Sequence, residues 1–195
     1  LKYFAKNRTW DKDSLEIYDE PITKSGTKIF EKRREFVSKL NPIVQNFYQI
    51  ISGGKESVSV FYESHLSTSS FEDLLKESLD RDRMLTYTSK GIHKDDLLFE
   101  MDSVLIKKIG SQGQQKSFLI SLKLAQMSLV KELTGKTPIL LLDDIFDKLD
   151  DNRVSQLIEL VNQENFGQIF ITDTHRERTE NVVKRINEES VIFEI

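Results

Sequence analysis

Two adjacent carboxylates, Asp143 and Asp144, follow the apolar run ILLL, which is typical of a buried parallel strand. Open α/β sheets place their ligands at the carboxyl ends of strands, so both acids are expected at a ligand-binding edge. One carboxylate could hold Mg²⁺ on nucleotide phosphates through water, and the next could orient or deprotonate an attacking water. Because neighbouring strand residues point to opposite faces, the two acids would have separate tasks. The alternative is a core strand that leaves the interior through two solvated acids.

A second stretch, GSQGQQKS at residues 110–117, has the composition of an anion-binding turn. Ser111 supplies a hydroxyl donor, and Gly113 lets the backbone come close to a ligand. The long helix expected to begin here would aim its unpaired N–H groups outward, toward an anion. The alternative is an ordinary helix cap after a loop, since Ser and Gly are common at both.

The triplet Gly135-Lys136-Thr137 looks like the end of a phosphate-binding loop but lacks the rest of one. Such a loop has the pattern GxxxxGK[ST] between a strand and a helix. Here Val130 stands where the first glycine belongs, and a helix precedes the triplet. Gly135 is better read as the left-handed residue that ends that helix, and Pro138 follows as a stop.

Further polar residues follow the two apolar strands. Asp173, Thr174 and His175 come directly after the strand QIFIT, and a neutral histidine there could bond a γ-phosphate and report its hydrolysis. If the two strands are neighbours, His175 lies beside Asp144. The Leu149-Asp150 pair could form a subunit-contact loop or simply cap the next helix.

Periodicity predicts an α/β fold with a largely parallel sheet, preceded by a mainly helical segment. Pro42 is expected to kink or restart a long helix over residues 22–51. The predicted helices also include FEDLLKESLDRDRMLTY, residues 113–134 with a stripe of Phe118, Leu122, Ala125, Leu129 and Leu133, a helix capped by Asp150 or Asp151, and TENVVKRINEE. The predicted strands are SVSVFYES, a hairpin of LLFEMD and VLIKKI turning near Asp102-Ser103, the buried TPILLLDD, the buried QIFIT and the final SVIFEI.

Composition bounds the possible partners. The formal net charge of −4 argues against a surface coated in positive charge, so any nucleic-acid contact must use a local patch. The absence of cysteine excludes disulfides, thiolate chemistry and cysteine-based zinc sites. No apolar run approaches the roughly 18 residues of a membrane span and no signal peptide is evident, so a soluble cytoplasmic protein without membrane contact is expected. The start at Leu1, inside an amphipathic charged segment, suggests a fragment of a longer protein.

Taken in order, these motifs resemble the C-terminal half of an ABC-type ATPase head. More narrowly, the chain is similar to the RecF family of bacterial recombination mediators, on the stretches GSQGQQKSFLISLKLAQ, PILLLDDIFDKLD and GIHKDDL. The likeness extends upstream to RREFVSKLNPIVQNFYQIISGGKESVSVFYES, which is similar to the family's helical arm. It implies an arm (lobe II) segment over residues 1–88 and the C-terminal part of the head over residues 89–195.

The resemblance also implies roles for particular residues. Ser111, Gln112, Gly113 and Gln114 would form the signature motif, which contacts ATP held by the opposite subunit. Asp143 would be the Walker B carboxylate that holds Mg²⁺. Asp144 would polarise the attacking water, and His175 stands at the switch-histidine position of the wider superfamily, where RecF-like sequences often lack histidine. Leu149 and Asp150 would form the dimer-contact loop, whereas the Gly91–Asp96 stretch, with Lys94 in place of the family's usual Arg, has no assigned role.

The function implied is that of a slow ATPase in DNA replication, repair and the SOS response. ATP would drive homodimerisation of the heads, and the paired heads would grip double-stranded and gapped DNA and cooperate with other recombination mediator proteins. Basic residues that could meet DNA phosphate lie on the arm and near the signature turn: Lys28, Lys32, Arg33, Arg34, Lys39, Lys107, Lys108 and Lys116.

One expected component is missing, since no GxxxxGK[ST] occurs in the 195 residues. The chain alone is therefore predicted neither to bind ATP tightly nor to hydrolyse it, because backbone amides and a lysine of that loop meet most of the phosphate charge. Two alternatives from other classes stay open. One is a receiver-like, magnesium-dependent signalling domain with Asp173 as phosphoacceptor, and the other is a non-catalytic arm and dimerisation module.

Overall fold

The computed structural model describes residues 1–7, 12–143, 149–163, 166–174, 180 and 191–193. The chain forms two compact units that are interleaved in sequence. Unit 1 comprises Leu1–Lys39 and Phe61–Leu98, and unit 2 comprises Leu40–Val60 and Phe99–Ile195. The sequence-based boundary between an arm and a head at residues 88 and 89 stays a prediction.

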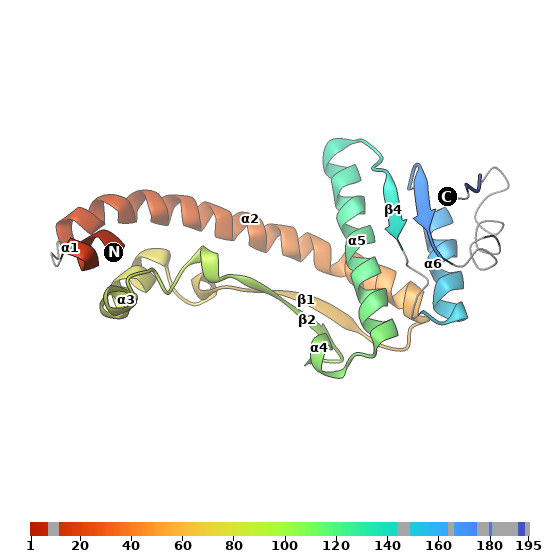
Figure 1. The fold of residues 1–195 in the computed structure, drawn as a ribbon, viewed down its shortest axis with the longest axis horizontal. Helices are drawn as coiled ribbons and strands as arrows, with labels where there is room; N and C mark the ends of the chain where they lie inside the picture. Colours follow the sequence, from red (N-terminus) through yellow and green to blue (C-terminus); the bar gives the residue numbers. More distant parts are fainter. Residues whose placement is uncertain (8–11, 144–148, 164–165, 175–179, 181–190, 194–195) are drawn as a thin grey trace. The chain divides into compact units, whose positions relative to one another are not determined.

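Figure 1 shows the order of the elements along the chain. They are α1 (Lys2–Asn7), α2 (Lys12–Ser52), β1 (Val58–Glu63), η1 (His65–Ser67), α3 (Phe71–Leu85), η2 (Ile92–Lys94), β2 (Asp96–Met101), β3 (Val104–Leu105), α4 (Ile106–Ile109), α5 (Gln112–Thr134), β4 (Leu140–Asp143), α6 (Asp151–Gln163) and β5 (Ile169–Thr172). One sheet has the strand order β1-β2-β3, and a second contains β4 and β5. None of the described helices is long and apolar enough to cross a membrane.

Helix α2 runs without a break through Pro42, so the expected restart of the helix there is wrong. Proline removes one helical N–H and crowds the preceding turn. Here the proline faces solvent, while Leu40 and Val44 on either side of it are 3% and 0% exposed. Burial of the opposite face therefore holds the helix together across a residue that disfavours it.

In unit 1, the ring of Phe71 sits where two glycines allow close approach. A Cβ atom added at Gly26 or at Gly91 would overlap this ring, and Gly91 also has a φ of +120°, which side chains rarely adopt. Phe71 begins α3, whose N-cap is Ser70: the Ser70 hydroxyl oxygen accepts the Asp73 N–H at 3.1 Å. The helix predicted for this segment is confirmed.

The Gly91–Asp96 stretch, which had no role on sequence grounds, fastens β2 to α2 and β1. The buried Asp95 carboxylate accepts hydrogen bonds from Arg33 Nη1 at 2.8 Å and from the Tyr62 hydroxyl. Arg33 Nη1 also donates to the Ile92 carbonyl at 2.7 Å. Burial and the neighbouring Asp95 carboxylate raise the pKa of Tyr62 above its ordinary value. The role of the Gly91–Asp96 stretch within unit 1 is therefore structural: it connects three elements through hydrogen bonds.

The β2–β3 hairpin predicted at Asp102-Ser103 is confirmed. Both turn residues have positive φ, 48° and 67°, as a tight two-residue hairpin turn requires. The second strand is shorter than predicted, because Ile106–Ile109 forms the helical turn α4. In a strand, Lys108 would share the buried face of Ile106, whereas the helical turn buries Ile106 and leaves Lys107 and Lys108 exposed.

Aromatic rings from distant segments form the core of unit 2. The Phe118 ring of α5 lies 5.2 Å from that of Phe99 and 6.4 Å from that of Tyr48, and Phe47 meets Phe166 at 6.4 Å. Helix α5 matches its predicted bounds and ends at Gly135 with a φ of +67°, which confirms the left-handed cap. Its predicted stripe is only partly buried, since Leu133 is 71% exposed.

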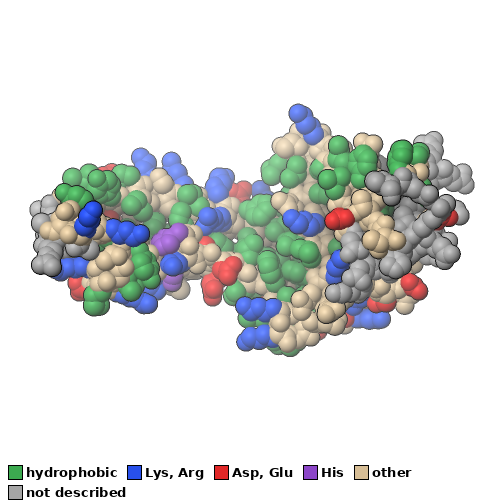
Figure 2. All heavy atoms as spheres, in the orientation of Figure 1, with side chains coloured by type: hydrophobic (Ala, Val, Ile, Leu, Met, Phe, Trp, Pro, Cys, Tyr) green, Lys and Arg blue, Asp and Glu red, His purple; other side chains and the backbone are tan. Residues whose placement is uncertain are grey.

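Strands β4 and β5 are parallel, as predicted, but the expectation that β4 is buried on both faces is wrong. Leu140 and Leu142 are buried, whereas Leu141 is 71% exposed and Phe170 of β5 is 49% exposed. Hydrophobic side chains accordingly lie at the surface over this strand pair in Figure 2. Within the described residues the sheet is covered on one face only.

The last two predicted elements fare differently. The helix expected over TENVVKRINEE lies outside the described residues except for Glu180, which is helical. The strand expected for SVIFEI is wrong for its described part. Residues 191–193 belong to neither a strand nor a helix, and they are exposed. An apolar, β-branched segment forms a strand only where another strand offers hydrogen bonds, and none of the described strands pairs with it.

We expect the substitution Asp95→Ala to destabilise the chain by roughly 2 kcal/mol. Removing one partner of a buried ion pair costs about 3–5 kcal/mol, and the value is reduced because Arg33 is 46% exposed. Urea unfolding followed by circular dichroism measures the change. As a matched control, Lys76→Met breaks the exposed Lys76–Glu72 pair and should leave the unfolding midpoint unchanged. Equal midpoints for both variants would contradict the structural role of Asp95.

Candidate functional site

Asp143 lies at the carboxyl end of β4, directly opposite Thr172 of the parallel strand β5. The Thr172 hydroxyl donates a hydrogen bond to the exposed Asp143 carboxylate. The strands that carry the two polar endings are therefore neighbours, which is the condition under which the sequence predicts His175 beside Asp144. Asp144 and His175, the predicted catalytic residues, lie outside the described residues.

Ser111 caps α5 through a reciprocal pair of hydrogen bonds with Gln114. The Ser111 hydroxyl oxygen accepts the Gln114 N–H at 3.3 Å, and the Gln114 side-chain oxygen accepts the Ser111 N–H at 2.7 Å. This capping box fixes the turn that contains all four predicted signature residues. The ordinary helix cap considered from sequence is thus present, and it does not exclude a ligand at the same place.

Hydrogen bonding separates the four signature residues into two kinds. Gln114 has both ends of its amide engaged within the fold, since its nitrogen also donates to Glu56 Oε1 at 2.8 Å. Ser111 is exposed and keeps its hydroxyl hydrogen to donate, and the Gln112 and Gly113 N–H groups have no acceptor in a preceding helical turn. Three donors at the start of α5 are therefore placed to meet an anion, whereas Gln114 is placed to hold the turn.

An ion pair between Arg153 of α6 and Glu56 of the α2–β1 loop supports this turn. Arg153 Nη2 lies 3.2 Å from Glu56 Oε1, and the two side chains are only 11% and 14% exposed. Arg153 Nη1 donates to the Ser117 hydroxyl at 3.0 Å, and that hydroxyl donates to the Gly113 carbonyl at 2.8 Å. Sequence reasoning missed both charged residues, because neither stands in a motif that a single sequence reveals.

Asp150 caps α6, as one of the two sequence-based alternatives predicted. Its carboxylate accepts the Arg153 N–H at 2.9 Å and lies 3.3 Å from Arg153 Nε. The backbone N–H of Arg153 and the charges of Arg153 and Lys55 lower the pKa of Asp150. The Asp150 side chain is 62% exposed and accessible to another subunit, whereas its neighbour Leu149 is buried. The dimer contact itself stays a prediction.

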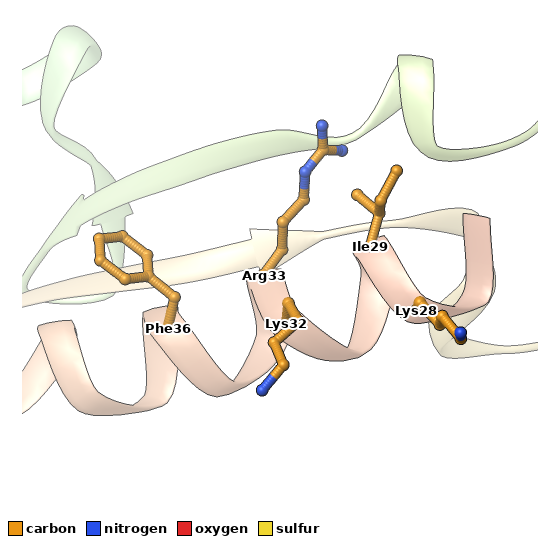
Figure 3. Close-up of a pocket in the computed structure, with 5 residues that line it drawn as sticks. All are labelled: Lys28, Ile29, Lys32, Arg33 and Phe36. Atoms are coloured by element: carbon orange, nitrogen blue, oxygen red, sulfur yellow. The ribbon is translucent and has the colours of Figure 1, made fainter. Parts of the chain in front are cut away.

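Several basic side chains of α2 interact with other side chains of the same helix. Lys32 and Lys39 both pair with Glu35 at 3.0 Å, and the Arg34 guanidinium lies 5.3 Å from the centre of the Phe30 ring. Figure 3 shows Arg33 extending toward the neighbouring segment while Lys28 and Lys32 point away from it. On the other unit, the exposed Lys107 and Lys108 precede the signature turn.

Within the described residues, no cluster of three or more carboxylate or histidine side chains could hold a metal ion. Among the described residues, the Asp143 carboxylate and the Thr172 hydroxyl are two oxygen donors that lie side by side at this edge. Both are hard oxygen donors of the type that Mg²⁺ prefers, and Mg²⁺ commonly uses one or two protein ligands together with phosphate oxygens and water. The donor set therefore fits a magnesium ion bound mainly by a nucleotide.

Comparisons with solved structures define the class of protein. The chain superimposes on the recombination mediator protein RecF of the RecFOR pathway, solved as RecF-ATPrS, with a TM-score of 0.73 and 27% identity over 89% of this chain and 48% of that one. An SMC ATPase structure matches with a TM-score of 0.51 at 12% identity, over 81% of this chain and 78% of that one. The fold is that of the C-terminal part of an ABC-type ATPase head.

Sequence comparison names the family within this class. The chain is 56% identical over all its 195 residues to the DNA replication and repair protein RecF of Flavobacterium johnsoniae, covering 54% of that protein. It is 46% identical over 187 residues, 95% of its own length, to RecF of Phocaeicola vulgatus, covering 50% of that protein. The chain is thus similar to RecF proteins along its whole length. It spans about half the length of these relatives, and no protein-family model matches it.

We expect Asp150→Ala to lower the stability of the chain by about 1 kcal/mol at neutral pH, the usual cost of losing an N-cap. A carboxylate whose pKa is lower in the folded state stabilises the fold above its unfolded pKa, and this contribution is lost as pH falls through the folded value. The difference between wild type and variant should therefore shrink below the ordinary pKa of 3.8. Thermal unfolding across pH 2–8 measures it.

The substitution Asp150→Asn serves as the control for this prediction. Asparagine is an equally good N-cap but does not titrate, so this variant should keep most of the stability and show no such change with pH. An Asp150→Ala variant as stable as the wild type at neutral pH would contradict the capping role.

Proposed function

We propose that the chain is part of a cytoplasmic RecF-family ATPase that acts in DNA repair, and that ATP controls its grip on DNA by pairing two heads. The observation that carries the proposal is the 56% identity to a RecF protein over all 195 residues of the chain. The capped turn at Ser111 and the polar end of the paired strand at Asp143 support the proposal.

Each predicted site residue then takes a defined part. Asp143, steadied by the Thr172 hydroxyl, would hold Mg²⁺ on the nucleotide of its own subunit. Bound Mg²⁺ would supply positive charge to the phosphates. Asp144 would orient the attacking water, and its carboxylate is one methylene shorter than the glutamate of most ABC proteins, which is consistent with slow turnover. His175, which follows β5 in the sequence, would contact the γ-phosphate.

The signature turn would act on the nucleotide of the opposite subunit. Ser111, with its free hydroxyl hydrogen, and the N–H groups of Gln112 and Gly113 would meet phosphate oxygens at the positive end of α5. Gln114 would hold this arrangement rather than touch the ligand, because its amide is engaged by Ser111 and Glu56. ATP would thus be shared between two heads, and its hydrolysis would release them.

DNA contact is the least localised part of the proposal. The paired heads would bind double-stranded and gapped DNA. Other recombination mediator proteins would cooperate with them. All the basic residues considered are exposed except the half-buried Lys116, and Arg33 is also bound to Asp95 within unit 1. A receiver-like signalling domain is disfavoured, since the chain has the fold of an ATPase head.

We predict that titration of ATP and Mg²⁺ into the 195-residue chain reveals neither high-affinity binding nor hydrolysis. The phosphate cradle is proposed to lie in the half of the RecF relatives that this chain does not match. A strand edge with isolated acids meets too little of the phosphate charge. Isothermal calorimetry and a phosphate-release assay measure both quantities, and micromolar binding by the chain would contradict the prediction.

In the full-length protein, Ser111→Arg should abolish ATP-driven pairing while leaving ATP binding by each head intact. In the proposed arrangement, an arginine at the turn would fill the space of the opposite nucleotide and would not touch the cradle of its own head. Analytical ultracentrifugation with and without ATP measures pairing, and a fluorescent ATP analogue measures binding. Ser128→Arg, on the same helix, is the control. Unaltered pairing of the Ser111 variant would instead favour the non-catalytic module.

A further inference from the structure

The guanidinium of Arg153 joins three segments of unit 2 through three different nitrogen atoms. Nη1 donates to Ser117 of α5 at 3.0 Å, Nη2 lies 3.2 Å from Glu56, and Nε lies 3.3 Å from Asp150 at the start of α6. We call this set, with Gln114 added, the Arg153 clamp. A planar guanidinium presents its donors in a fixed fork, so these contacts fix the acceptors relative to one another.

The clamp reaches Ser111, Gly113 and Gln114 of the signature turn by short hydrogen-bonded paths. The Ser117 hydroxyl, which accepts the hydrogen bond from Arg153, donates one to the Gly113 carbonyl at 2.8 Å. Glu56 Oε1 accepts Gln114 Nε2 at 2.8 Å, and the oxygen of the same amide accepts the Ser111 N–H at 2.7 Å. Ser111 and Gly113 therefore cannot shift relative to Arg153 without breaking a hydrogen bond to a mostly buried group.

The acidic end of the clamp is itself anchored. The Ser57 N–H and hydroxyl both donate to Asp102 Oδ1, at 3.0 and 3.1 Å, and the Asp102 N–H donates to the Ser57 carbonyl at 2.9 Å. The fully buried Tyr48 donates its hydroxyl to Glu56 Oε2 at 3.4 Å. The β2–β3 hairpin turn thus holds the loop that carries Glu56.

We infer that Arg153 and Glu56 are positioning residues that fix the signature turn and Asp150 as one unit, so that both are presented together to the opposite subunit. This inference rests on the proposed function. The turn contacts the opposite nucleotide and Asp150 the opposite polypeptide, and two contacts that must form at once bind more strongly when their spacing is already set. The clamp contributes to pairing and takes no part in holding the nucleotide of its own head.

Three variants of the full-length protein test the inference. Arg153→Lys keeps the positive charge but replaces the fork with one ammonium group, which cannot serve three separated acceptors. Glu56→Gln keeps the acceptor for Gln114 and removes the charge that faces Arg153. The double variant Glu56→Gln with Arg153→Met leaves no buried charge unpaired, so it separates loss of positioning from loss of stability. Lys123→Met, at an exposed position of α5, is the matched control.

The expected result is a selective loss of pairing. Sedimentation with ATP should show the dimer dissociation constant raised by about 10- to 100-fold in all three variants, the range seen when a group that orients a ligand-binding residue is removed. Binding of a fluorescent ATP analogue to the separated heads should be unchanged. Hydrogen–deuterium exchange of residues 111–117 should be faster in the variants, whereas the Lys123 variant should match the wild type in every measurement.

The possible failures are distinguishable. A wild type that does not pair with ATP overturns the proposed function, and this inference with it. A wild type that pairs, together with folded clamp variants that pair equally well, overturns the inference alone. Full recovery of pairing in the double variant would likewise overturn it, because the defect of the single variants would then come from an unpaired buried charge.

Discussion

The polar edge of unit 2 depends on one mostly buried ion pair, Arg153 with Glu56. Taking two charges out of water is costly, and the attraction between them offsets that cost only when their remaining hydrogen-bonding groups are also satisfied. Here they are satisfied, because Ser117 and Asp150 bind the Arg153 guanidinium and Gln114 donates a hydrogen bond to the Glu56 carboxylate. An apolar pair could fill the same space, but it would leave the helix starts free to move independently. The ion pair is therefore better understood as a means of fixing geometry than as a source of stability.

Much of the local structure follows from the sequence, because it depends on residues within a few positions of one another. The left-handed cap at Gly135, the N-cap at Ser70 and the two-residue turn at Asp102-Ser103 are each decided by a short stretch of backbone and one or two side chains. The parallel pairing of β4 with β5 was also predictable, since two apolar strands separated by a helix favour that arrangement.

Other features depend on contacts that no local pattern encodes. Pro42 is tolerated because distant segments bury the opposite face of α2, and residues 106–109 form a helical turn because a strand would bury Lys108. Glu56 and Arg153 are 97 positions apart, and nothing near either residue indicates the other. The role of Gly91–Asp96 likewise depends on long-range contacts, because its partners Arg33 and Tyr62 lie in earlier elements. Motif spacing located the candidate site, whereas long-range contacts explain how its turn is held.

The interleaving of the two units has a consequence for synthesis on the ribosome. Unit 1 is complete once residue 98 has emerged, but the C-terminal part of α2, from Leu40 to Ser52, belongs to unit 2 and must wait for Phe99 and later residues. In the finished fold Val44, Phe47, Tyr48 and Ile51 are at most 2% exposed, so this part of α2 carries an uncovered apolar face until α5 has been translated. The nascent chain is therefore most in need of chaperone protection during this interval. The same topology means that no single cut in the chain separates the two units from each other.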